Sequence, residues 1–73
     1  MALQDVPAPM PGTVKEFLVG VGDRVNLGEE LLIVESMKME IPIESPAAGT
    51  VAEVLVEPSQ RVDEGALLMR IEV

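Results

Sequence analysis

The residue whose side chain is best suited to a chemical reaction is Lys38, which lies between Met37 and Met39. A lysine amine that has lost its proton is a nucleophile for acyl groups. The chain has no histidine and no cysteine, so it offers no thiolate, no imidazole base and no His/Cys metal cluster. The composition therefore predicts neither a catalytic residue nor a metal site, and Lys38 is left as the candidate functional residue.

The thirteen acidic residues are the other group that could do chemistry. Two carboxylates can hydrolyse glycosidic bonds across a cleft, but a chain of 73 residues leaves little room for one. The formal net charge of −8 argues against nucleic acid and against anionic membrane surfaces as partners. No apolar run reaches the roughly 18 residues of a membrane span, and no signal segment is visible, so we expect the cytoplasm.

Lys38 needs a scaffold that presents it, and the flanking residues indicate a β-hairpin. Apolar runs at 31–34 and 41–43 surround the motif, which predicts strands at 31–35 and 39–43 joined by a two-residue turn, Met37-Lys38. Such a turn requires positive φ at both residues and usually contains Asn-Gly. Met37 and Lys38 would each accept roughly 1 kcal/mol or more of strain. The turn is therefore expected to be selected for what it presents.

The rest of the chain is an internal repeat with an offset of 37 residues. Segment 9–36 aligns with 46–73 without a gap, with twelve identities in 28 positions. Two copies are too few for a solenoid, so we expect halves 1–36 and 38–73 to pack about an approximate two-fold axis within one domain, 1–73. Frequent Gly and Pro predict short strands in an all-β barrel or sandwich. The predicted strands are 4–8, 13–19, one around Val25 and 31–35, then 39–43, 50–56, one around Val62 and 67–73.

Positions that are apolar in both copies predict the core: Val14/Val51, Leu18/Leu55, Val25/Val62, Leu31/Leu68, Leu32/Met69 and Val34/Ile71. Glu16 and Glu53 interrupt the apolar alternation, which indicates a bulge or an edge position near them. The repeat also predicts that 2–6 pairs antiparallel with 68–72. Both termini would then lie at the end of the barrel opposite Lys38.

Met37-Lys38-Met39 at a hairpin tip, placed at the junction of two repeats, resembles the attachment site of biotinyl domains of the biotin carboxyl carrier family. The resemblance covers essentially all 73 residues. It implies a flattened barrel of two antiparallel sheets and biotin in amide linkage on Lys38. It also implies a non-catalytic swinging-arm carrier of a biotin-dependent carboxylase, served by three partners: biotin-protein ligase, biotin carboxylase and carboxyltransferase. Lipoyl domains share the fold but usually have Asp-Lys-Ala around their lysine. The alternatives to a biotin carrier are a lipoyl carrier domain and an unmodified protein-interaction domain.

The residues around Lys38 are candidates for recognition by the ligase and the partner enzymes. Methionine is flexible and polarizable, which suits a surface that meets several partners. Met39 could instead pack on the strand below it, with Ile41 and Ile43 on the same face, and the two glutamates could be ordinary solvated carboxylates. Lys15, the other lysine, is expected on the solvent face of its strand. The recognition candidates are Glu35, Ser36, Met37, Met39 and Glu40.

Overall fold

The computed structural model describes residues 2–73, and this part of the chain is built from eight β-strands without a helix. The first half holds β1 (Leu3–Pro7), β2 (Gly12–Phe17), β3 (Arg24–Val25) and β4 (Glu30–Ser36). The second half holds β5 (Met39–Glu44), β6 (Gly49–Val54), β7 (Arg61–Val62) and β8 (Leu67–Glu72). The search for a helix that could cross a membrane, made over residues 2–73, found none.

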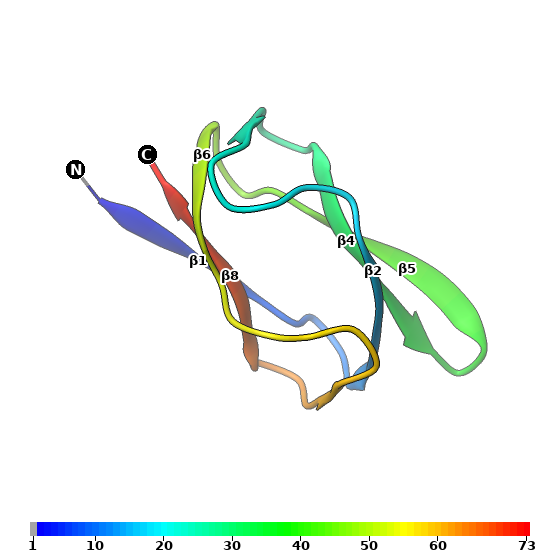
Figure 1. The fold of residues 1–73 in the computed structure, drawn as a ribbon. Helices are drawn as coiled ribbons and strands as arrows, with labels where there is room; N and C mark the ends of the chain where they lie inside the picture. The colour runs from blue at the N-terminus through cyan, green and yellow to red at the C-terminus, as the bar shows by residue number, and fades with distance from the viewer. Residues whose placement is uncertain (1) are drawn as a thin grey trace.

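The strands form two four-stranded antiparallel sheets, with the orders β1-β8-β6-β3 and β5-β4-β2-β7. Each strand has an equivalent in the other half: β1 and β5, β2 and β6, β3 and β7, β4 and β8. Exchanging the members of every pair converts the strand order of one sheet into that of the other. The predicted two-fold arrangement is confirmed by this exchange. Each sheet takes two strands from each half, so neither half has a sheet of its own (Figure 1).

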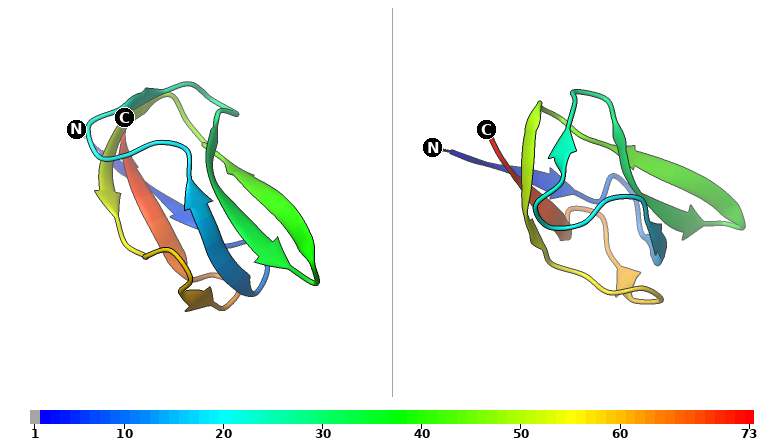
Figure 2. Two further views of the ribbon diagram at one scale, coloured as in Figure 1. Left: turned by 45° about the vertical axis from the view of Figure 1, so that its right-hand side comes forward. Right: turned by 45° about the horizontal axis from the view of Figure 1, so that its top comes forward.

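The two ends of the chain meet as predicted. Leu3 lies opposite Glu72 in the β1–β8 pair, and the Val73 N–H donates to the Ala2 carbonyl at 2.9 Å. Both views of Figure 2 place the termini at one end of the molecule and the β4–β5 turn at the other. The barrel is elongated, with extents of 35 × 17 × 17 Å, so this separation runs along its long axis.

The core is aliphatic and lies between the sheets. Each sheet has an inner strand, β4 or β8, that supplies several fully buried side chains to the core. Their fully buried side chains are Leu31, Leu32, Val34, Leu68, Met69 and Ile71. Burying a side chain of this size stabilises a fold by about 1.5–3 kcal/mol. All of these residues were predicted to be core residues.

Two β-bulges, one in each half, change which residues face the core, so part of the predicted core is wrong. The pairing register shifts between Val14 and Glu16 in β2 and between Val51 and Glu53 in β6. Each bulge adds a residue and moves the alternation by one position beyond it. The prediction that Leu18 and Leu55 are core residues is therefore wrong, because their side chains are 45% and 40% exposed. Their neighbours Phe17, Val19, Val54 and Val56 contact the core instead.

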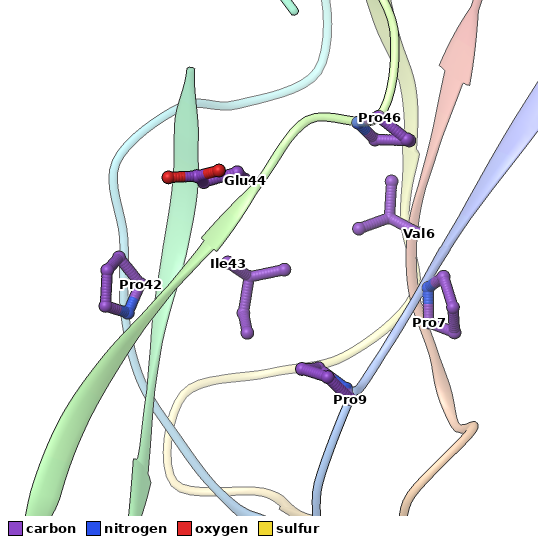
Figure 3. A pocket seen from close by; sticks show the side chains of 7 residues that line it. All are labelled: Val6, Pro7, Pro9, Pro42, Ile43, Glu44 and Pro46. Carbon is purple, nitrogen blue, oxygen red and sulfur yellow. The ribbon is translucent and has the colours of Figure 1, made fainter. Parts of the chain in front are cut away.

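The barrel opens between the edge strands β1 and β5. Figure 3 shows a hollow there, with Val6 and Ile43 pointing into it. Its volume is about 270 Å³ and its lining includes Pro7 and Pro42, one from each edge strand. Proline has no N–H and is tolerated in a sheet at an edge. These prolines leave the edges with fewer donors for pairing with another chain.

Candidate functional site

The β4–β5 turn has the backbone geometry that the sequence predicted. Ser36 pairs with Met39 at the end of the strands, and the two residues between them have φ values of 52° for Met37 and 64° for Lys38. Both lie in the left-handed region, where a side chain costs about 1–2 kcal/mol. The turn is held there by the strands below it, since Val34 on β4 is completely buried. It presents Met37, which is 91% exposed, and the exposed Lys38.

A close contact between β2 and β4 fixes the base of this hairpin. A Cβ added to Gly12 would lie 2.6 Å from the carbonyl oxygen of Glu35 and 2.7 Å from a side-chain carbon of Val34. Only glycine lets the two strands approach this closely. The backbone next to the turn therefore has little freedom to shift relative to the rest of the barrel.

Lys15 lies in the β2 bulge and contacts two of the predicted recognition residues. Its Nζ is 2.6 Å from Glu40 Oε2 and 3.6 Å from Glu35 Oε2. Glu35 and Glu40 lie directly opposite each other on β4 and β5, where two like charges repel. The hydrogen bond with Glu40, together with the charges of Glu40 and Glu35, raises the pKa of the Lys15 amine. Lys15 thus joins three strands at the base of the hairpin.

This ion cluster was not predicted, although Lys15 is exposed as expected. One feature of the sequence could have indicated the cluster. Lys15 is not repeated in the second half, where Ala52 occupies the equivalent position in the second bulge. Glu35 and Glu40 remain exposed at the surface, but their carboxylates have a partner within the chain. A ligase that contacts them would meet an ion cluster rather than two free charges.

Met39 does not pack on the strand below it. Its side chain is 65% exposed, whereas Ile43, on the same face of β5, is 5% exposed. Ser36 is half-buried beside the turn. The structure therefore places the five recognition candidates around Lys38, with both methionines on the surface.

A second hollow, of about 320 Å³, lies beside the turn. It is formed where the end of β4 and the turn meet the chain before β2 and the start of β7. Its lining residues are Met10, Pro11, Gly12, Glu35, Ser36, Met37 and Arg61. Among residues 2–73, no group of three or more acidic, His or Cys side chains could hold a metal ion. The site therefore offers the exposed amine of Lys38 and, beside it, the surface of this hollow.

Comparison with known proteins identifies the family of the chain. The family model described as "Biotin-requiring enzyme" matches residues 4–71. The biotin carboxyl carrier protein of Streptococcus mutans is 54% identical over 39 residues, which is 53% of this chain and 30% of that protein. The pyruvate carboxylase of Bacillus subtilis is 42% identical over 67 residues, which is 92% of this chain and 6% of that enzyme.

The fold is shared with a solved structure, the urea carboxylase of Kluyveromyces lactis. The TM-score is 0.93 at 25% identity, over 99% of this chain and 6% of that one. The chain spans less than a third of the carrier protein and a much smaller part of the two carboxylases. Because the family model covers nearly every residue and the fold agrees with it, the chain belongs to the family of biotin-requiring enzymes, as a biotinyl domain.

Proposed function

We propose that this domain is a biotin carboxyl carrier and that its biotin is attached through an amide bond to Lys38. The observation that carries the proposal is the turn itself. A lysine and a methionine occupy two positive-φ positions at the end of the barrel opposite the termini. A turn that only closed a hairpin would use Asn-Gly at less cost. The strain is accounted for if the lysine must be presented there.

Attachment requires an acyl donor and a base that the chain does not contain. A biotin-protein ligase supplies biotin as an acyl-adenylate, and the Lys38 amine attacks its carbonyl carbon. The amide bond forms, the bond between the acyl group and the phosphate breaks, and adenylate leaves. The ammonium of Lys38 must first lose a proton, and the chain has no histidine or cysteine to accept it, so the ligase supplies that base.

The loaded domain then works as a mobile carrier. Biotin accepts a carboxyl group at a biotin carboxylase site and gives it up at a carboxyltransferase site, and the domain catalyses neither step. Tethering raises the effective concentration of the cofactor at both sites. Relatives that are themselves carboxylases support this role.

The test is loading by a biotin-protein ligase with biotin and ATP, read out as intact mass. We expect one biotinyl group on the wild-type chain and on Lys15→Arg, which keeps the charge at the ion cluster. We expect none on Lys38→Arg, because a guanidinium does not attack the acyl group. Circular dichroism should show that Lys38→Arg is folded, since an exposed turn lysine contributes little to stability. Labelled Lys38→Arg would refute the assignment, and a lipoyl increment on chain purified from its host would identify the other carrier type.

A further inference from the structure

The hollow beside the turn starts one residue from the attachment point, because Met37 lines it and precedes Lys38 in the chain. Its volume of about 320 Å³ lies at the lower end of the roughly 300–1,000 Å³ found for small-molecule pockets. A group carried on the Lys38 side chain can therefore reach this hollow by folding back over the turn.

The hollow has an apolar part and a positive part. Met10, Pro11 and Met37 supply apolar surface, and methionine side chains adapt their shape to a ligand. Arg61, on β7, supplies a guanidinium. The ion pairs formed within residues 2–73 use Lys15 and Arg70 as their cations, so Arg61 has no carboxylate partner there.

The carboxylate that lines the hollow together with Arg61 already has a cationic partner. Glu35 is the one carboxylate that lines the hollow, and Lys15 contacts it from the β2 side at 3.6 Å. In a chain with a net charge of −8, an arginine left free beside an apolar surface favours an anionic or strongly polar ligand.

We propose that this hollow is a resting site for the biotin head group when the carrier is between its two partner enzymes. The inference rests on the proposed function. The apolar thiophane ring lies against Met10 and Met37, and the ureido oxygen accepts a hydrogen bond from Arg61. When the ureido ring carries a carboxyl group, Arg61 also pairs with that carboxylate. The hollow is open to solvent, so the head group leaves it readily.

The repeat provides a matched control for Arg61. Arg24 occupies the equivalent position on β3, at the end of the barrel that holds the termini. Arg24 and Arg61 are both exposed. The substitutions Arg24→Gln and Arg61→Gln thus remove the same charge from equivalent positions, and only Arg61→Gln changes the hollow.

The experiment uses the biotinylated chain, with loading first verified by intact mass. Nuclear Overhauser contacts between biotin ring protons and the methyl groups of Met10 and Met37 are measured before and after carboxylation by a biotin carboxylase with ATP and bicarbonate. We expect contacts to Met10 in the wild type, with the docked fraction higher after carboxylation. Arg61→Gln should lower the carboxylated docked fraction by up to about fivefold, the range of an exposed ion pair, while Arg24→Gln leaves it unchanged.

Each other outcome overturns a distinct claim. If the chain loads with biotin but the Met10 methyl shows no contact with it, the resting site is refuted and the carrier function stands. Contacts to Val6 or Ile43 would place the head group in the other hollow and would also refute the site. Equal effects of Arg24→Gln and Arg61→Gln would refute the role of Arg61. A chain that takes no biotin refutes the carrier function, and this inference with it.

Discussion

Lys15 and Arg70 hold the two ion clusters of the barrel, one on each sheet. Lys15 bridges Glu35 and Glu40 beside the β4–β5 turn, and Arg70 bridges Asp5 and Glu53 on the sheet that holds the chain ends. Hydrogen bonding to Glu40 raises the pKa of Lys15, and hydrogen bonding to Asp5 raises the pKa of Arg70. These side chains are well exposed, so each cluster orients neighbouring strands more than it stabilises the fold.

The two clusters are expected to respond differently to alkaline pH. A raised pKa in the folded state means that the charged amine stabilises the fold below the unfolded pKa of about 10.4, and that this contribution is lost as pH rises through the folded pKa. The stability difference between wild type and Lys15→Met should therefore be constant from neutral pH to pH 9 and should shrink above about pH 10.5.

Arg70→Met is the matched control, because a guanidinium stays charged throughout this range. Its stability difference should persist at the pH where the Lys15→Met difference has shrunk. Urea unfolding midpoints at a series of pH values measure both differences. A Lys15→Met difference that grew with pH would contradict the assignment of the cluster.

The turn between β4 and β5 gives a prediction about strain. Asparagine tolerates the left-handed region much better than methionine does, so Met37→Asn should stabilise the domain by about 0.5–1 kcal/mol. The thermal unfolding midpoint is the measurement. Met39→Asn is the control, because Met39 is equally a surface methionine but lies in β5 with ordinary φ. A lower midpoint for Met37→Asn would show that the methionine makes a stabilising contact.

The contact between β2 and β4 gives a second prediction at this scale. Gly12→Ala places a methyl group 2.6 Å from a backbone oxygen of β4, and the overpacking should destabilise the domain by about 1–3 kcal/mol. Gly20→Ala is the control, since nothing lies within 4 Å of its added Cβ and its φ is not positive. Denaturant unfolding compares the two. Equal stabilities would mean that β2 and β4 can move apart freely.

The strands and the turn were predictable because they depend on local sequence. Apolar runs on both sides of Met37-Lys38 specify a hairpin, and the repeat specifies which strands are equivalent. The sequence predicted a bulge or an edge position near Glu16 and Glu53, and the structure has bulges there. The exact register was not predictable, because Phe17, Leu18 and Val19 are all apolar and fit either one. The hydrophobic pattern therefore does not show which of them faces the core, and only pairing with β4 decides it.

In the candidate site, too, local features were predictable and contacts between separate strands were not. Lys38 and its neighbours were predicted because they are contiguous in the chain. The contacts of Lys15 with Glu35 and Glu40 depend on the relative register of β2, β4 and β5, and the hollow combines the chain before β2 with β4 and β7. Interactions that depend on the pairing of separate strands become visible only once the sheets are assembled.

At the scale of the whole molecule, the approximate two-fold axis exchanges the end that holds Lys38 with the end that holds the termini, so the two lie at opposite ends of the barrel. The bend at 57–60 lies at the lysine end, with Ser59 and Gln60 bonded to the backbone of Val14. The equivalent bend at 20–23 lies at the terminal end and is bonded to Val51. A partner joined to the chain at one end should therefore leave the other end accessible.

This separation predicts the effect of inserting one folded protein at either bend. Insertion within 57–60 should slow biotinylation by the ligase, because it crowds the lysine end, while insertion within 20–23 should leave the rate close to that of the wild type. Intact mass over a time course measures the rate, and circular dichroism shows that both chains keep their sheets. Equal slowing by the two insertions would refute the separation.

The pairing of the chain ends also determines how the domain bears mechanical load. Leu3 lies opposite Glu72 at the open end of the β1–β8 pair, and the hydrogen bonds of an antiparallel pair run perpendicular to its strands. Tension that separates the two termini therefore acts along these hydrogen bonds and breaks them one after another, in unzipping geometry. Tension between Lys38 and either terminus runs along the strands and loads many bonds at once in shear. The barrel is therefore expected to resist a pull on Lys38 and to open under a pull that separates its two termini.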